Sequence, residues 1–228
     1  MRLSLYLNNL YRRHFIAAGF LAALVGISPL ADAVSLASAS PIILVLGDSL
    51  SAEYGLPRGS GWVALLEKRL QAEKITATVV NASISGDTTA GGRSRLAALL
   101  TQHQPTHVII ELGANDALRG LSLQLTEDNL QQMTQTAQKA GAKVLLLGMQ
   151  VPPNYGQDYG SRFAALFGDV AKAHQAGLVP FLLKGVADTA DAEADITRLF
   201  QADRIHPKAI AHPTLLANVW PELQKQLK

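Results

Sequence analysis

From residue 41 onward, continuous apolar runs alternate with segments in which apolar residues recur every three or four positions. The runs predict strands buried on both faces, and the spaced segments predict amphipathic helices. The predicted strands are residues 41–46, 77–80, 107–112, 143–149 and 177–182. The predicted helices are residues 62–72, 93–100, 124–140, 161–176 and a last one from Pro207 onward. This alternation predicts an α/β fold in which helices cover both faces of a five-stranded parallel sheet.

Residues 1–39 have the pattern of a secretory signal peptide. A basic start that includes Arg12-Arg13 precedes an uncharged apolar run, residues 15–27, and two small-residue motifs at 31–33 and 37–39 follow it. The run is shorter than the ~20 apolar residues of a membrane-spanning helix. An uncleaved anchor is the alternative, and the arginine pair leaves the twin-arginine export route open. We expect a signal peptide that is removed, a single domain in residues 40–228 with no membrane span, and a periplasmic or secreted protein.

Composition narrows the possible functions further. The chain of 228 residues contains no cysteine, which excludes disulfides, a catalytic thiol and thiolate metal sites. Its formal charge of +2 comes entirely from residues 1–39, which contain three Arg and one Asp. The remaining chain is formally neutral and has no global field to attract DNA or RNA, so we expect no nucleic-acid partner.

Polar clusters follow three of the predicted strands and precede the last helix. Gly47-Asp48-Ser49 follows the first strand, residues 81–88 follow the second, and residues 113–116 follow the third. Residues 203–207 lie at the start of the last predicted helix. Because the carboxyl ends of parallel strands meet at one edge of the sheet, these segments are predicted to form a single site.

Five residues in these segments are suited to acyl transfer. Ser49, which we expect to be exposed at the start of a helix, is the candidate nucleophile. A serine hydroxyl needs a base to take its proton, and His206 is the candidate base, with Asp203 three residues earlier to orient it. The backbone N–H of Gly86 and the side-chain amide of Asn115 are candidate donors to an oxyanion.

Each segment also has a purely structural interpretation. Ser49 can be a helix N-cap, residues 203–207 a helix start, and residues 113–116 an Asx turn. Residues 86–92 can be a mobile glycine loop or a phosphate cradle, although no Gly-x-Gly-x-x-Gly or Walker pattern supports the cradle.

Other titratable residues were weighed against the same roles. His212 is the closest rival for the base, since it lies in the same region and also precedes a proline. Asp48 and Asp116 are interpreted as structural residues that tie loops together, and residues 188–195 as a solvated loop.

Taken together, the polar segments resemble the GDSL, or SGNH, hydrolase family, in which Ser, Gly, Asn and His occupy four separated blocks. The matching segments are LGDSLSAEYGL (46–56), VVNASISGDTTAGG (79–92), ELGANDALRG (111–120), PPNYG (152–156) and IHP (205–207). They extend over nearly all of residues 40–228. Ala114 and Arg204 depart from the family pattern, which commonly has glycine at both positions.

The resemblance implies a flavodoxin-like three-layer α/β/α sandwich and a serine hydrolase acting on ester or thioester bonds. It makes Ser49 the nucleophile, His206 the general base and Asp203 its orienter. The oxyanion hole would comprise the backbone N–H groups of Ser49 and Gly86 and the side chain of Asn115. Bacterial periplasmic enzymes that hydrolyse acyl-CoA, lysophospholipids and aryl esters are the most similar members. The resemblance implies a small-molecule acyl ester or thioester as substrate, and no metal or organic cofactor.

The substrate's acyl chain is expected along the rim formed by residues 117–121 and 152–155, in contact with Leu118, Leu121 and Tyr155. The alternative is that these leucines fold back onto the core. Two functional alternatives also remain: a carbohydrate acetylesterase with the same machinery, and a ligand-binding module that has lost catalysis. We expect a monomer.

Overall fold

Five parallel strands form the central sheet of the computed structural model, which describes residues 40–189 and 192–228. They are β1 (Ile42–Gly47), β2 (Thr78–Asn81), β3 (His107–Glu111), β4 (Lys143–Leu147) and β5 (Gly177–Val179), in the order β2-β1-β3-β4-β5. The five-stranded parallel sheet predicted from the sequence is confirmed, and its order is the flavodoxin-like one. The predicted signal peptide lies outside the described residues.

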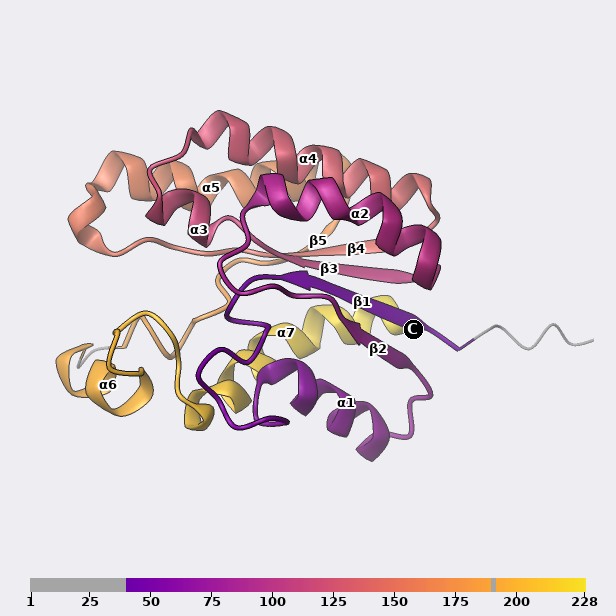
Figure 1. Cartoon of the computed structure of the whole chain (residues 1–228), viewed down its shortest axis with the longest axis horizontal. Coiled ribbons are helices and arrows are strands. Elements are labelled where there is room, and N and C mark those ends of the chain that lie inside the picture. Colours follow the sequence, from indigo (N-terminus) through magenta and orange to yellow (C-terminus); the bar gives the residue numbers. More distant parts are fainter. Residues whose placement is uncertain (1–39, 190–191) are drawn as a thin grey trace, which may run out of the picture. The chain divides into compact units, whose positions relative to one another are not determined.

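Helices cover both faces of this sheet, so the predicted three-layer sandwich is also confirmed (Figure 1). On one face lie α2 (Thr89–His103), α4 (Leu123–Lys139) and α5 (Gln157–His174). On the other lie α1 (Trp62–Ala72) and α7 (His212–Leu227). None of the helices in the described part of the chain is both long and apolar enough to cross a bilayer.

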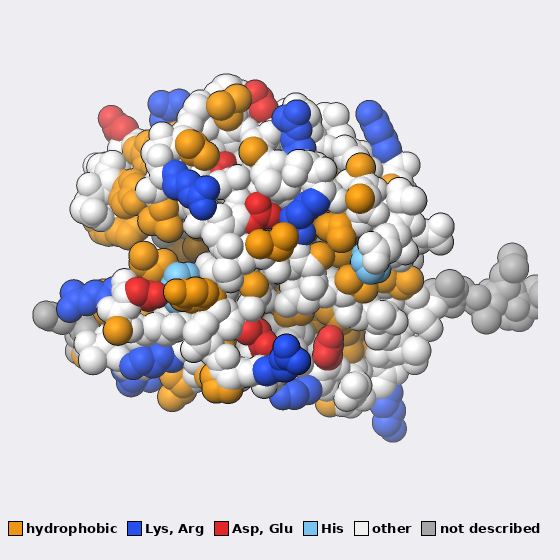
Figure 2. Space-filling view, viewed as in Figure 1, with side chains coloured by type: hydrophobic (Ala, Val, Ile, Leu, Met, Phe, Trp, Pro, Cys, Tyr) orange, Lys and Arg blue, Asp and Glu red, His pale blue; other side chains and the backbone are white. Residues whose placement is uncertain are grey.

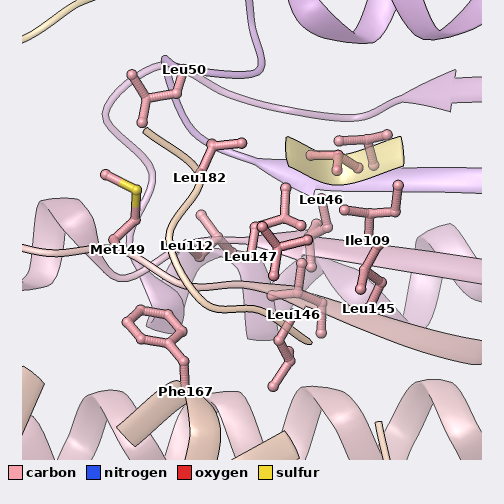
Figure 3. Close-up of a cluster of buried hydrophobic side chains, with 14 of the residues drawn as sticks. Leu46, Leu50, Ile109, Leu112, Leu145, Leu146, Leu147, Met149, Phe167 and Leu182 are labelled. Atoms are coloured by element: carbon pink, nitrogen blue, oxygen red, sulfur yellow. The ribbon is translucent and has the colours of Figure 1, made fainter. Parts of the chain in front are cut away.

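The core consists of the strands and the helix faces that pack on them. Leu46, Ile109 and Leu146, from three neighbouring strands, are all at most 1% exposed. Figure 3 shows these side chains within the buried apolar cluster, to which Phe167 of α5 also belongs. Burying one such side chain contributes about 1.5–3 kcal/mol, which is why continuous apolar runs become the middle strands of the sheet.

Several element boundaries differ from those predicted. β5 ends at Val179 because Pro180 has no N–H to continue the ladder. α2 begins at Thr89 and not at residue 93, because the Thr88 side chain caps it by accepting a hydrogen bond from the N–H of Gly91. Residues 86–92 are therefore not one mobile glycine loop, since the last four of them belong to the helix.

The structure also contains elements that the sequence patterns did not indicate. These are α3 (Ala114–Leu118), α6 (Ala192–Leu199) and two short 3-10 helices, η1 (Pro153–Tyr155) and η2 (Ala209–Ala211). The interpretation of residues 188–195 as a loop is therefore wrong for Asp195, which lies in α6. The last helix starts at His212 and not at Pro207, because Pro207 instead forms an isolated antiparallel bridge with Phe200.

The strand order creates a topological switch point at the carboxyl ends of β1 and β3. The chain leaves β1 toward α1 on one face of the sheet and leaves β3 toward α4 on the other, so the two connections diverge (Figure 1). In open α/β sheets, ligands bind at such a switch point. The segments after β1 and β3, which contain Ser49 and Asn115, lie at this position.

Candidate active site

Ser49 lies half-buried in the turn that follows β1. The backbone makes one turn there, closed by the N–H of Ala52 donating to the carbonyl of Asp48 at 2.9 Å, and then continues irregularly to α1. The prediction that Ser49 starts a helix is therefore wrong. The side chain of Asp48 fixes the turn, because its Oδ1 accepts a hydrogen bond from the N–H of Leu50 at 3.0 Å.

A chain of two hydrogen bonds joins Ser49, His206 and Asp203, which we call the rim triad. Ser49 Oγ lies 2.8 Å from His206 Nε2, and His206 Nδ1 lies 2.7 Å from Asp203 Oδ2. An ionised carboxylate can only accept, so Nδ1 donates to Asp203 and Nε2 is left to accept the serine proton. The structure thus brings together the three residues that the sequence predicted, from positions 157 residues apart.

The loop that holds His206 is a tight reversal of the chain between α6 and η2. The N–H of Gln201 donates to the carbonyl of His206 at 2.8 Å, and the N–H of Arg204 donates to the carbonyl of Gln201 at 3.0 Å. Arg204 has φ +59°, a left-handed conformation that favours glycine, which accounts for the glycine common at this position. The ring of Tyr54 packs against the imidazole, with 4.4 Å between the ring centroids.

Asp203 has an unusually low pKa for an aspartate. Partial burial raises the pKa of its carboxyl, but hydrogen bonds from the backbone and side chain of His206 and from the N–H of Ile205 outweigh this effect and hold the pKa at about 2. Asp203 Oδ1 accepts the N–H groups of Ile205 and His206 at 3.0 Å each. The carboxylate therefore stays ionised at neutral pH and fixes both the loop and the imidazole.

The predicted oxyanion donors lie on loops tied to the same strand end. Neither the N–H of Ser49 nor that of Gly86 donates a hydrogen bond to any described residue. Gly86 has φ +81°, which favours glycine, and its segment is attached to β1 by the N–H of Ile84, which donates to Gly47 at 3.0 Å. Asn115 Nδ2 donates one proton to Asp48 Oδ2 at 2.9 Å. An amide nitrogen carries two protons, so one stays available to a ligand.

Beneath the rim triad lies a set of buried polar side chains, Asp48, Ser51 and Glu111, which we call the buried acid cluster. Glu111 Oε2 accepts hydrogen bonds from the N–H of Asp48 at 3.2 Å and from the hydroxyl of Ser51 at 2.8 Å. The indole of Trp62 donates to Ser51 Oγ at 3.1 Å. All three members are at most 1% exposed.

Burial controls protonation in this cluster. It raises the pKa of Asp48 to about 6, although the hydrogen bond from the N–H of Leu50 and the hydrogen bonds with Glu111 and Asn115 act in the opposite direction. Burial, reinforced by the charge of Asp48, raises the pKa of Glu111 well above its usual value. Both effects favour the protonated form of Glu111 and so act against two adjacent negative charges in the cluster.

These features can be compared with known proteins. Residues 45–212 match the GDSL-like lipase/acylhydrolase family. The chain belongs to this family. It is 50% identical over 190 residues to Esterase TesA of Pseudomonas aeruginosa, covering 83% of this chain and 91% of that relative. It is 42% identical over 189 residues to an Arylesterase of Vibrio mimicus, with coverage of 83% and 91%. It is 41% identical over 188 residues to Thioesterase 1/protease 1/lysophospholipase L1 of Escherichia coli, with coverage of 82% and 86%.

Solved structures of family members agree with the fold. The crystal structure of TesA matches with a TM-score of 0.76 at 51% identity, covering 81% of this chain and 99% of that one. The psychrotrophic esterase EstA from Pseudoalteromonas sp., inhibited by monoethylphosphonate, matches with a TM-score of 0.75 at 39% identity, covering 82% of this chain and 99% of that one. Both solved chains thus correspond to the hydrolase domain alone, which folds by itself in these relatives.

Other residues weighed from the sequence have structural roles in this hydrolase. His212, the rival base, is buried, and its Nδ1 accepts the N–H of Trp62 at 3.0 Å, so it fixes the start of α1. Burial lowers the pKa of His212. Asp116, interpreted as a loop-tying residue, accepts the N–H of Thr89 at 2.9 Å and holds the start of α2 near α3.

Sequence reasoning missed two residues beside the site, Glu111 and Tyr54. Glu111 belongs to the matching segment 111–120, and Tyr54 belongs to the segment 46–56. The signal for Glu111 was present, because it is the one charged residue in the apolar run 107–112 and stands at the end of β3. Tyr54 left no such signal, since its contact with His206 depends on the path of two loops that are far apart in the sequence.

The three predicted substrate contacts lie at the same edge of the sheet: Leu118 ends α3, Leu121 lies between α3 and α4, and Tyr155 ends η1. Leu118 and Leu121 are 45% and 42% exposed, so the alternative that they fold back onto the core is wrong. Tyr155 is half-buried and stacks on Tyr159 of α5, with 6.0 Å between ring centroids. Arg119, between the two leucines, donates to the carbonyl of Gly86 at 2.7 Å and so joins this segment to the candidate oxyanion donor.

Proposed function

We propose that residues 40–228 hydrolyse acyl esters and thioesters through an acyl-enzyme formed on Ser49. The observation that supports this most strongly is the continuous hydrogen-bond chain from Ser49 Oγ through His206 to Asp203. A chain of this kind gives a serine hydroxyl the base that it needs to act as a nucleophile.

The reaction has two steps. Ser49 Oγ attacks the carbonyl carbon while His206 Nε2 takes its proton, and the carbonyl oxygen becomes an oxyanion. The free N–H groups of Ser49 and Gly86 and the remaining proton of Asn115 Nδ2 stabilise it; loss of one such donor typically costs ~10²–10³ in rate. His206 then gives its proton to the leaving alcohol or thiol, and the reverse sequence with water releases the acid and restores Ser49.

The names of the relatives support this range of substrates. They are an esterase, an arylesterase and a thioesterase that is also a lysophospholipase. We assign aryl esters, acyl-CoA thioesters and lysophospholipids to this chain on that ground. These substrates share an acyl group, whose alkyl chain Leu118 and Leu121 would contact from the rim.

The acyl-chain path that we propose runs from Ser49 past Leu118 and Leu121 toward Tyr155. A cavity of about 410 Å³ adjoins the end of this path and is lined by residues between Gln150 and Ala164, among them Val151, Pro152 and Pro153. Each methylene buried along such a path contributes ~0.8 kcal/mol, so the preference for chain length should be graded.

The proposed function is tested with a substrate panel and a covalent probe. Purified protein is given acyl-CoA, lysophospholipid, aryl ester and acetylated sugar, and is treated separately with a fluorophosphonate. We expect hydrolysis of the first three substrates and a single adduct on Ser49 by mass spectrometry. Hydrolysis of the acetylated sugar alone would instead assign a carbohydrate acetylesterase. Folded protein that takes up no probe and hydrolyses nothing would contradict the proposal.

The acyl-chain path has a separate test in Leu118→Asp. This change should lower activity on decanoyl aryl esters by more than tenfold while acetyl aryl esters lose less than about twofold, because only the long chain contacts the rim. Leu125→Asp is the matched control, since Leu125 is 61% exposed in the first turn of α4 and off the proposed path. Equal losses on both substrates would place the path elsewhere.

Export and oligomeric state complete the proposal. We propose that residues 1–39 are a signal peptide, that the mature chain begins at Ser40 or Val34, and that it is a periplasmic monomer. Amino-terminal sequencing of protein from the cell envelope tests the first two points, and light scattering tests the last. A membrane-bound chain that still begins at Met1 would favour the uncleaved anchor.

A further inference from the structure

Exposed large apolar side chains gather at one end of the described part of the chain. Five of them, Tyr54, Ile84, Leu118, Leu121 and Ile205, are between 42% and 53% exposed. They lie on the four segments that follow β1, β2 and β3 or precede η2 and that carry Ser49, Gly86, Asn115 and His206. We call these five residues the apolar collar. The other two exposed large apolar residues, Leu125 and Ile210, also lie at this end, at the start of α4 and in η2.

The opposite end of the sheet has no such surface in the residues that the structure describes. Its loops, at 73–77, 104–106, 140–142 and 175–176, expose no large apolar side chain, and Ile75 packs against the core. Isolated exposed apolar residues are normal on soluble proteins, but confinement of all of them to one end is not a random scatter. Exposed large apolar side chains are therefore a feature of the end that carries the candidate active site and not of the described surface in general.

Contacts place the collar around the candidate nucleophile. Tyr54 packs on the imidazole of His206, and Ile205 is the neighbour of that histidine. Arg119, between Leu118 and Leu121, is bonded to Gly86, two residues from Ile84. Figure 2 shows apolar side chains on both sides of a hollow at the left of the molecule, with basic side chains on each side as well.

Three arginines on these segments, Arg58, Arg119 and Arg204, are exposed and have no ion-pair partner among the described residues. The acids on the same loops are engaged: Asp203 with His206, Asp87 with Arg95, and Glu53 with the N–H groups of Gly59 and Gly61. Cationic groups without acidic partners thus accompany the collar.

We propose that this end of the molecule docks on the surface of anionic phospholipids, with the collar at the boundary between headgroups and acyl chains. Apolar side chains insert at such a boundary, and arginines attract the headgroup phosphates. A free phosphate would need the arginines but not the collar. A protein seated on the collar would cover Ser49, whereas a lipid surface supplies acyl esters to it. The inference rests on the proposed function only for the source of those esters.

The test measures binding of the hydrolase domain, residues 40–228, to vesicles by co-sedimentation. Ser49→Ala is used so that the lipid is not consumed. Vesicles of phosphatidylcholine mixed with phosphatidylglycerol are compared with vesicles of phosphatidylcholine alone. We expect at least about fivefold stronger partition onto the mixed vesicles, because each arginine near an anionic surface adds about that factor. Equal partition onto both, or binding to neither, overturns the proposal.

Variants then separate the collar from general surface effects. Ile84→Glu and Arg58→Glu should each weaken partition at least about fivefold. Ala140→Glu and Lys172→Glu make matched charge changes at exposed positions at the opposite end of the sheet and should weaken it less than twofold. If the control variants lose as much vesicle partition as Ile84→Glu and Arg58→Glu, the proposal is overturned. Displacement of the protein from vesicles by inorganic phosphate at constant ionic strength would overturn it as well.

An activity assay then distinguishes a failure of the docking surface from a failure of the proposed function. The domain with Ser49 intact is assayed on a soluble acetyl aryl ester without vesicles, and Ile84→Glu and Arg58→Glu should retain that activity within about twofold. If hydrolysis is absent while vesicle binding follows the predicted order, the proposed function fails and the docking surface stands. If hydrolysis is normal and binding is absent, only the docking surface fails.

Discussion

The rim triad and the buried acid cluster each contain an aspartate, and the two carboxyl groups respond to their surroundings in opposite ways. Asp203 receives hydrogen bonds from its own loop and has a pKa of about 2. Asp48 is buried and has a pKa of about 6 in spite of its hydrogen bonds. Partial exposure lets hydrogen bonds dominate the pKa of Asp203 at the rim, whereas desolvation dominates the pKa of Asp48 in the buried acid cluster.

The opposite pKa shifts of the two aspartates fit different purposes for the rim triad and the buried acid cluster. In the proposed mechanism, the rim triad holds an ionised carboxylate beside an imidazole that gains and loses a proton in each cycle. The buried acid cluster must hold the turn around Ser49 and the side chain of Asn115 in place. Asp48 connects the buried acid cluster to the rim triad, because it precedes Ser49 in the chain. It also accepts a hydrogen bond from the side-chain amide of Asn115.

The largest expected effect is on turnover, and it should distinguish Ser49 in the rim triad from Ser51 in the buried acid cluster. Ser49→Ala should lower turnover ~10⁴–10⁶-fold, since a triad member is lost, while stability changes little. Ser51→Ala removes the donor to Glu111 and the acceptor of the Trp62 indole, so it should cost about 1–3 kcal/mol of unfolding free energy and lower turnover less than tenfold. Initial rates and urea unfolding measure both. If folded Ser51→Ala were as inactive as Ser49→Ala, the nucleophile would be assigned to the wrong serine.

A second prediction concerns the protonation of Glu111. Glu111→Gln keeps a neutral side chain that can accept from Asp48 N–H and Ser51, so it should change unfolding free energy by less than about 1 kcal/mol. Glu111→Leu leaves both donors buried without an acceptor and should cost about 2–4 kcal/mol. Chemical unfolding compares the two variants. A glutamine variant as unstable as the leucine variant would mean that Glu111 is ionised.

Much of the fold and site could be predicted because the relevant signals are local. Buried strands in a parallel sheet are apolar throughout, so residues 41–46 and 107–112 are visible as strands in the sequence. The candidate residues Ser49 and Asn115 directly follow those strands. The sheet topology then brings them to one edge.

The parts that could not be predicted depend on contacts between distant residues or on backbone geometry. Glu111 meets Asp48 across 63 positions, and only the structure shows that the two carboxyls are adjacent. Ser49 was expected to start a helix, but hydrogen bonds to Asp48 make an isolated turn instead. The left-handed conformation of Arg204 is not indicated by the residue itself, because arginine rarely adopts it.

The third prediction uses pH to distinguish the two aspartates. The folded protein holds the Asp48 proton more tightly than the unfolded chain, so this group destabilises the fold above about pH 6 and the cost is relieved as pH falls toward 4. Asp203 has the opposite sign: its contribution is present above about pH 4 and is lost as pH falls through 2. His107 and His212, whose pKa values are lowered, oppose Asp48 below pH 6.5, so wild type must be compared with Asp48→Asn.

The difference in unfolding free energy, wild type minus Asp48→Asn, should rise by about 1–3 kcal/mol between pH 7.5 and pH 5. Urea unfolding at several pH values measures it. A flat difference for Asp48→Asn would mean that its carboxyl titrates normally.

The smallest expected effect concerns strain in the loop of the rim triad. Arg204 has φ +59°, and the left-handed region costs a residue with a Cβ roughly 1–2 kcal/mol. Arg204→Gly removes that cost but adds about 0.5–1 kcal/mol of backbone entropy to be lost on folding, so stability should rise by up to about 1 kcal/mol. Arg204→Ala removes the same guanidinium and keeps the strain. The glycine variant should therefore be the more stable of the two by thermal unfolding, and equal stability would mean that the loop relaxes without glycine.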